Sequence, residues 1–122
     1  MIKSSERRNI IAEKSMAFAV RIVNLCKHLR REKSEQVMAK QVLRSGTSIG
    51  ANVREAESAQ SKADFVSKMA IALKECGETS YWLELLFRTE YISQKEFSSI
   101  VTDCEELFAL LTAIIKTSRR ER

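Results

Sequence analysis

Proline is absent from this 122-residue chain, and glycine occurs only three times. Because turn-rich β sandwiches and barrels depend on these two residues at their turns, such folds are excluded. Collagen-like and Pro/Gly-rich disordered chains are excluded for the same reason. Since 44% of the residues are apolar, enough remain to build one core, and the length allows a single domain over residues 1–122. The sequence therefore predicts a globular all-α domain.

Apolar residues recur at intervals of three and four in four successive segments, which is the pattern of amphipathic helices. The first helix is expected to end near Lys33, and Ser34 is predicted to cap a second helix that runs to about Ala59. Gly46 and Gly50 lie inside this second segment, so a turn is the alternative there. The apolar spacing continues through both glycines, which favours an unbroken helix with a face for close packing.

The starts of the last two helices are marked by capping residues. Ser61 with Asp64 resembles a capping box, and Ser93 with Glu96 forms a clearer one. The fourth helix is expected to end near Thr117, with a frayed basic tail beyond it. Because the connections between the four segments are short, neighbouring helices must be antiparallel. We therefore predict an up-down-up-down four-helix bundle with both termini at one end.

Positive charge is concentrated at the start of the chain. Residues 1–31 contain eight basic and two acidic side chains, a net charge of +6, whereas the whole chain has a net charge of +5. Such asymmetry indicates a polyanionic partner, either nucleic acid or an anionic membrane surface. The alternative is a helix face that is charged only because it is solvated.

Arg7, Lys14 and Arg21 recur every seven residues and so form a basic ridge along one helix. Such cations neutralise phosphates without reading a base sequence. Aromatic residues are few and do not alternate with the cations, so stacking on single-stranded bases is not supported. Structured RNA recognised through its backbone fits better. The predicted nucleic-acid-binding residues are Lys3, Arg7, Arg8, Lys14, Arg21, Arg119, Arg120 and Arg122.

The first helix carries apolar residues on more than one side, and its polar stripe is narrow. A helix of this kind is usually covered from two sides. One side belongs to its own bundle, and we expect the other to contact a second copy of the chain. Met16, Val20 and Val23 are the predicted oligomer-interface residues.

Residues for catalysis, metal binding or cofactor binding are not evident, so we expect a protein that is not an enzyme. His28 is the single histidine, and no Glu-x-x-His pair occurs. Cys26, Cys76 and Cys104 form no C-x-x-C motif and are expected to be buried free thiols in a reducing cytosol. No signal peptide is visible, and the longest apolar stretch, residues 16–20, cannot span a membrane. We expect a cytoplasmic protein.

Acidic residues of the third helix suggest one internal ion pair. Glu75 and Glu78 flank its apolar face and could pair with Arg44 or Arg54 of the second helix. If such a pair is partly buried, it would fix the register of the two helices more than it would add stability.

Several segments together resemble a known family, the four-helix-bundle proteins encoded in intervening sequences of 23S rRNA. The segments are 43–56 (LRSGTSIGANVREA), 63–75 (ADFVSKMAIALKE), 78–86 (ETSYWLELL) and 18–22 (FAVRI). The resemblance implies a bacterial, cytoplasmic bundle that assembles as a ring-shaped homopentamer and brings no catalytic residues. It also implies kinship to the accessory protein of diversity-generating retroelements, a basic pentamer that binds RNA and a reverse transcriptase. Val53 and Arg54 depart from the Ile-Ala often found there.

Together these observations predict a non-enzymatic, RNA-associated homo-oligomer. The alternative is an oligomeric adaptor or scaffold for a protein partner, such as a reverse transcriptase, without direct RNA binding.

Overall fold

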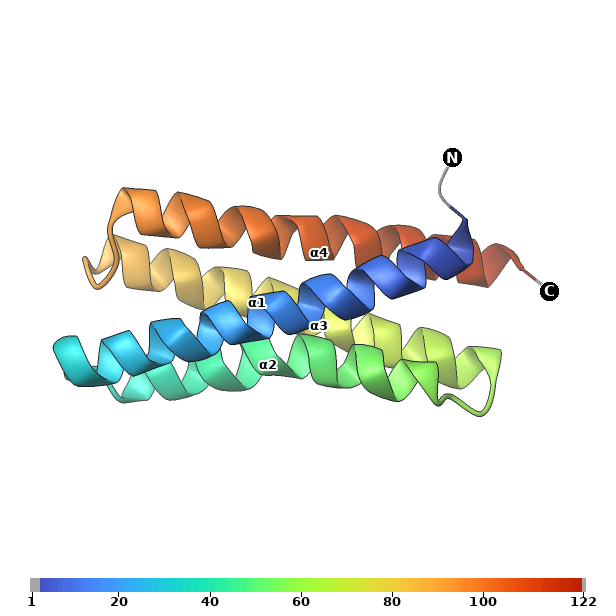
Figure 1. Cartoon of the computed structure of the whole chain (residues 1–122), viewed down its shortest axis with the longest axis horizontal. Helices are drawn as coiled ribbons and strands as arrows, with labels where there is room; N and C mark the ends of the chain where they lie inside the picture. Colours follow the sequence, from blue (N-terminus) through green and yellow to red (C-terminus); the bar gives the residue numbers. More distant parts are fainter. Residues whose placement is uncertain (1–2, 122) are drawn as a thin grey trace.

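Four long helices account for most of the chain. The computed structural model describes residues 3–121, and no strand occurs in that range. The helices are α1 (Ser4–Glu32), α2 (Val37–Glu57), α3 (Lys62–Arg88) and α4 (Gln94–Arg120), and they lie side by side (Figure 1). The prediction of an all-α domain is confirmed.

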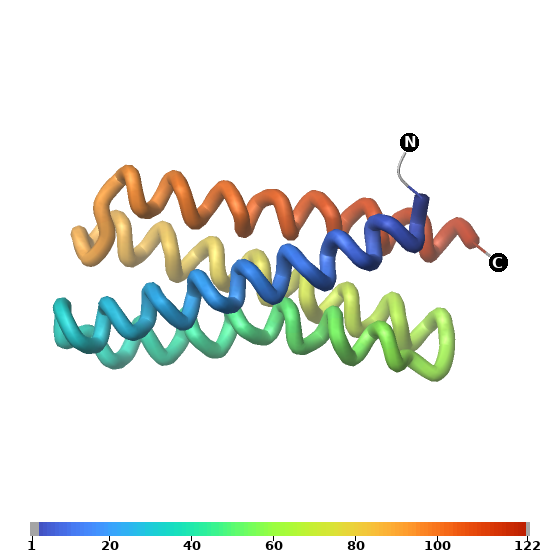
Figure 2. Tube along the Cα trace, in the orientation of Figure 1, coloured from blue at the N-terminus to red at the C-terminus, as the bar shows by residue number. Residues whose placement is uncertain are grey.

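The helices pack in the order in which they occur along the chain. Each contacts its neighbour in sequence, and α4 returns to contact α1, less extensively than α1 contacts α2. Across the described residues the backbones of the diagonal pairs, α1 with α3 and α2 with α4, do not approach each other closely, and those helices meet through side chains. Consecutive helices run in opposite directions, so the two termini lie at the same end (Figure 2). The up-down-up-down bundle is confirmed.

The core is a continuous cluster of side chains from the inward faces of all four helices. Residues fully shielded from solvent come from every helix, including Ile22, Ile49, Leu83 and Leu111. The buried polar side chains Ser15, Ser45 and Thr79 donate hydrogen bonds to backbone carbonyls of their own helices, which removes the cost of burying them.

The predicted starts of α3 and α4 are confirmed. Ser61 Oγ accepts a hydrogen bond from the backbone N–H of Asp64 at 3.0 Å. Ser93 Oγ accepts one from the N–H of Glu96 at 3.1 Å, and the Glu96 carboxylate accepts the N–H of Ser93 at 2.8 Å. These two hydrogen bonds hold the pKa of Glu96 below its ordinary value. Both caps satisfy N–H groups that the helix itself cannot satisfy.

The predicted cap of α2 is wrong. Ser34 has a φ of 53°, in the left-handed region, and α2 begins three residues later, at Val37. The N–H of Glu35 donates to the carbonyl of Leu29 at 2.9 Å, so Ser34 belongs to the turn that ends α1. The Glu35 carboxylate instead accepts the N–H of Met38 at 2.7 Å at the start of α2.

The predicted frayed tail from about residue 117 is also wrong, because α4 continues to Arg120. Ile115 and Ser118 are buried, so the last turns of α4 pack on the bundle. Arg7 donates to Thr117 Oγ1 at 3.1 Å, and Ser4 donates to Glu121 Oε1 at 3.3 Å. The start of α1 therefore holds the end of α4 in place.

The two glycines of α2 lie against α1 in an unbroken helix, as predicted. A Cβ atom on Gly46 would lie 2.8 Å from Cγ1 of Ile22, a distance that packed atoms do not tolerate. A Cβ on Gly50 would lie 3.4 Å from the backbone oxygen of Ser15, close to ordinary contact. Gly46 thus sets how closely α1 and α2 approach.

All three cysteines are free and buried, as the sequence predicts. Cys26 Sγ donates to the carbonyl of Ala39 at 3.3 Å, and burial raises the pKa of Cys26 to about 11. Cys104 Sγ donates to the carbonyl of Cys76 at 3.4 Å. These thiols pack in the core as small apolar groups.

Replacing Gly46 by alanine should destabilise the bundle. The added methyl meets Ile22, which is itself fully buried, so overpacking should outweigh the gain in helix propensity and leave a net loss of about 1 kcal/mol. Gly77→Ala is the matched control, because its Cβ would meet nothing within 4 Å, and it should stabilise α3 by about 0.5–1 kcal/mol. Urea denaturation measures both. Equal stabilisation by the two substitutions would contradict the close packing.

Candidate nucleic-acid interface and assembly surface

The basic ridge of α1, made of Arg7, Lys14 and Arg21, lies along the interface with α4. Arg21 makes the most contacts: its Nη1 lies 2.7 Å from Oδ2 of Asp103 and 3.2 Å from the backbone oxygen of Ser99. Its Nη2 donates to Ser99 Oγ at 3.0 Å. The guanidinium therefore joins α1 to the first half of α4.

The other two ridge residues also reach α4. Lys14 Nζ pairs with Oε1 of Glu106 at 2.9 Å, and this hydrogen bond raises the pKa of Lys14. Arg7 donates to Thr117 Oγ1 at 3.1 Å. The ridge thus crosses the interface between α1 and α4 at three levels of the bundle.

These contacts lie at the surface and are individually weak. The Arg21 and Asp103 side chains are 41% and 46% exposed, and ion pairs of that kind contribute about 0–1 kcal/mol each. They supplement apolar packing where α1 and α4 contact each other less extensively than other neighbours. A phosphate that bound the ridge would have to compete with these partners on α4.

Predicted nucleic-acid-binding residues at the two ends of the chain are brought together. Lys3 and Arg8 lie at the start of α1, and Arg119 and Arg120 lie in the last turn of α4, at the same end of the bundle. All four are exposed, and within residues 3–121 none of them forms an ion pair. We call these four residues the terminal basic cluster. Arg122 lies outside the described residues.

One member of the terminal basic cluster has an aromatic partner. The Arg8 guanidinium carbon lies 4.2 Å from the centre of the Phe65 ring at the start of α3. This contact orients the guanidinium without neutralising its charge.

The predicted interface residues form an exposed apolar patch on α1. Met16, Val20 and Val23 are 50%, 53% and 36% exposed in the single chain, whereas Phe18 and Ile22 on the inward side are buried. The patch is available for contact with another molecule, as the assembly prediction requires.

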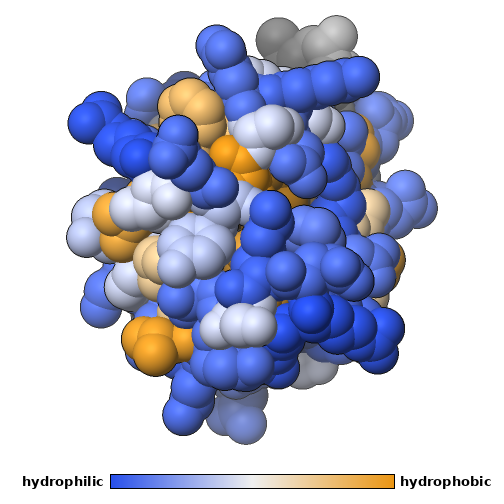
Figure 3. Space-filling view, turned by 90° about the vertical axis from the view of Figure 1, so that its left-hand side faces the viewer, coloured by the Kyte–Doolittle hydropathy of each residue, from blue (hydrophilic) through white to orange (hydrophobic). Residues whose placement is uncertain are grey.

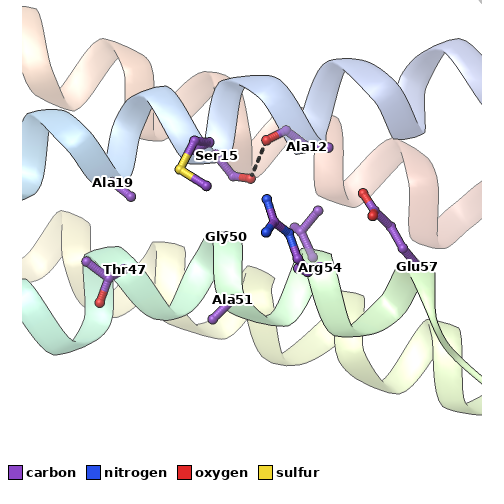
Figure 4. A pocket seen from close by; sticks show the side chains of 10 residues that line it. Ala12, Ser15, Ala19, Thr47, Gly50, Ala51, Arg54 and Glu57 are labelled. Carbon is purple, nitrogen blue, oxygen red and sulfur yellow. Dashed lines mark hydrogen bonds between the residues drawn. The ribbon is translucent and has the colours of Figure 1, made fainter.

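A groove runs between α1 and α2 beside this patch (Figure 4). Its volume is about 430 Å³, and small side chains on both helices create it, among them Ala12, Ala19 and Ala51. Met16 of the apolar patch also lines the groove, and Arg54 extends from α2 toward α1 within it. The groove and the apolar patch therefore form one continuous surface.

Comparison with known proteins identifies the family. The sequence model described as "23S rRNA-intervening sequence protein" matches residues 7–113. The chain belongs to the 23S rRNA-intervening sequence protein family. A solved structure from Bacteroides thetaiotaomicron VPI-5482, a protein of unknown function from the S23 ribosomal protein family, is 61% identical and superimposes with a TM-score of 0.89. The match covers 90% of this chain and 98% of that one. No curated protein matches the chain.

The part of the chain that matches the 23S rRNA-intervening sequence protein family covers some predicted sites and not others. It contains the basic ridge, the apolar patch and Arg8. Lys3, Arg119, Arg120 and Arg122 lie outside it. Most of the terminal basic cluster therefore belongs to the ends of this chain rather than to the matched region.

The predicted ion pair between α2 and α3 is confirmed for Arg44. Its guanidinium contacts Glu78 and lies 3.4 Å from Oε2 of Glu75. Trp82 Nε1 also donates to Glu78 at 3.1 Å. Arg54 takes no part in this network and lines the groove instead.

Metal-binding clusters and membrane-spanning helices are both absent from the part of the chain that the structure describes. Residues 3–121 hold no group of three or more His, Cys, Asp or Glu side chains that could bind a metal ion. No helix in that range has the length and apolar character needed to cross a membrane.

The basic ridge is visible in the sequence, but its partners on α4 are not. Nothing in the spacing of α1 indicates that Asp103, Glu106 and Thr117 face it, because those contacts depend on how α4 is rotated in the bundle. Phe65 beneath Arg8 was missed for the same reason.

The Arg21–Asp103 pair should couple weakly and respond to salt. In a double-mutant cycle with Arg21→Ala and Asp103→Ala, we expect a coupling free energy of about 0.2–1 kcal/mol at low ionic strength. Urea denaturation at low and high salt measures it, and the coupling should shrink at high salt because the pair is exposed. No coupling at low salt would show that the contact does not stabilise the interface between α1 and α4.

Proposed function

We propose that the chain is a non-enzymatic, cytoplasmic homo-oligomer that binds structured RNA through its basic surface. The terminal basic cluster carries the proposal, because four exposed cations from both ends of the chain gather without ion pairs among the described residues.

The proposed contacts are to phosphates. Lysine and arginine side chains release counterions when they bind a nucleic-acid backbone, which gives affinity without base sequence preference. Arg7, Lys14, Arg21 and Arg122 are proposed to add to the terminal basic cluster, with the three ridge residues exchanging partners on α4 for phosphates.

Assembly would multiply this affinity. We propose that the apolar patch on α1 contacts a second copy, and the family resemblance favours a ring of five. Each copy would present its own terminal basic cluster, and several weak phosphate contacts on one assembly act together on a single RNA.

Val20→Glu should dissociate the oligomer and leave the fold intact. Val20 is 53% exposed in the single chain, so the new carboxylate is solvated there, whereas an interface would bury it without a partner. Light scattering should give the wild type a mass several times the 13.9 kDa of one chain, and should give the variant the mass of a single chain. Ser67→Glu, at an exposed position on α3, is the control. A monomeric wild type at micromolar concentration would contradict the proposal.

RNA binding should weaken steeply as salt rises, with a slope in log Kd against log salt of about 0.7–0.9 per phosphate contacted. The double variant Arg119→Glu/Arg120→Glu should lower affinity and reduce that slope by about two, without changing the oligomer. Fluorescence anisotropy with a labelled RNA hairpin measures this, and Lys40→Glu/Lys74→Glu is the charge-matched control. Absence of binding to the hairpin at low salt would contradict the proposed function.

A second candidate is an adaptor for a protein partner such as a reverse transcriptase, without direct RNA contact. The continuous surface formed by the apolar patch and the α1–α2 groove favours it. Docking through apolar surface should change little with salt, whereas phosphate binding must weaken. Measuring how the affinity for RNA and the affinity for a protein partner change with salt therefore separates the two candidates.

A further inference from the structure

A second group of exposed cations lies at the end of the bundle opposite the termini. This end, which we call the loop end, carries the α1–α2 and α3–α4 connections, and its surface is mostly hydrophilic (Figure 3). Residues 27–33 contain four cations, Lys27, Arg30, Arg31 and Lys33, and one carboxylate, Glu32, which is a net charge of +3. All four cations are exposed, and within residues 3–121 none forms an ion pair.

Helix stability accounts for only part of this group. Cations in the last turn of a helix are favoured by the helix dipole, which explains Arg30 and Arg31. Lys27 precedes that turn and Lys33 follows the helix. In contrast to the ridge residues, Lys27, Arg30 and Arg31 have no partner on α4 to give up before they bind a phosphate, whereas Lys33 lies near the carboxylate of Glu96.

A hollow lies between the end of α1 and the α3–α4 connection, and Lys33 is the one of these four cations that lines it. Its volume is about 580 Å³, and His28, Lys33 and Tyr91 are among the residues that line it. A second hollow of about 480 Å³ shares His28 and Glu96 with the first and continues between α1 and α4. Both hollows are open surface depressions rather than enclosed cavities, so a group bound there would keep one side in solvent.

The lining of the hollow suits a nucleobase better than a phosphate. Tyr91 is half-buried and offers an aromatic surface, while Glu90 and Glu96 place carboxylates in the lining. Carboxylates repel phosphates but accept hydrogen bonds from the amino groups of bases. Aromatic rings stack on any unpaired base. Phosphates are thus favoured on the cations outside and a base is favoured inside.

We propose that the loop end binds an unpaired nucleotide of an RNA, with its base in the hollow against Tyr91 and the phosphates of the adjoining RNA backbone on Lys27, Arg30, Arg31 and Lys33. This inference rests on the proposed function and names the RNA feature that is recognised, a hairpin loop or bulge. It departs from the sequence-based expectation that stacking is unsupported, because Tyr91, Lys33 and His28 line the same hollow.

The experiment compares two labelled RNAs, a blunt duplex and a hairpin with the same stem and an unpaired loop, by fluorescence anisotropy on the full chain. We expect the wild type to prefer the hairpin. Tyr91→Leu keeps an apolar side chain for packing but removes the ring, so it should weaken hairpin binding about tenfold and leave duplex binding unchanged. Tyr91→Phe should retain the preference. Circular dichroism checks that each variant is folded.

Two charge-reversal variants test the cations at the loop end. Arg30→Glu/Arg31→Glu should weaken hairpin binding, reduce its salt slope by about two, and lower the preference for the hairpin. Arg119→Glu/Arg120→Glu changes the same number of charges in the last turn of another helix at the opposite end. This variant should weaken binding of the hairpin and of the duplex to the same extent, so the preference for the hairpin should remain.

The outcomes that overturn the inference differ from those that overturn the proposed function. Equal affinity of the wild type for hairpin and duplex, or an unchanged preference in Tyr91→Leu, overturns the loop-end site while RNA binding stands. A preference lost in Arg119→Glu/Arg120→Glu and kept in Arg30→Glu/Arg31→Glu places the site at the other end. Binding of neither RNA at low salt overturns the proposed function itself.

Discussion

The close approach of α1 and α2 at Gly46 is the constraint on which the rest of the bundle depends. With no side chain on Gly46, Ile22 packs directly against the α2 backbone. This contact brings α1 close to α2. The side of α1 that faces away from α2 is left to contact α4. The apolar patch, the groove and the ridge all take their positions from this placement of α1. A single glycine therefore influences surfaces on two sides of the same helix.

The two interfaces of α1 are stabilised in different ways. Against α2 it packs through Gly46, Gly50 and apolar side chains, so that interface depends on shape. Against α4 it adds ion pairs and hydrogen bonds at the surface, which depend on salt. A partner that carries phosphates competes only with the second kind of contact. RNA binding along the ridge is therefore compatible with an intact core.

The fold was predictable because apolar spacing and two capping serines define the helices locally. The prediction failed at Ser34 and after Thr117, where the outcome depends on contacts between distant residues. Ser34 follows the turn that closes on Leu29, and the end of α4 is held by Arg7 and Ser4 from the start of the chain. The candidate sites follow the same rule: the cations were visible in the sequence, whereas the carboxylates and aromatic rings beside them depended on the packing of α4 and the α3–α4 connection.

The contact between α1 and α4 has a kinetic consequence. The other close helix–helix interfaces join neighbours in sequence and so close short loops, whereas the α1–α4 interface must close nearly the whole chain. Such long-range contacts are expected to form after the local helical hairpins during folding. Interactions that are absent from the transition state slow unfolding rather than speed folding. The ion pairs of Lys14 and Arg21 therefore act on the lifetime of the folded bundle more than on the rate at which it forms.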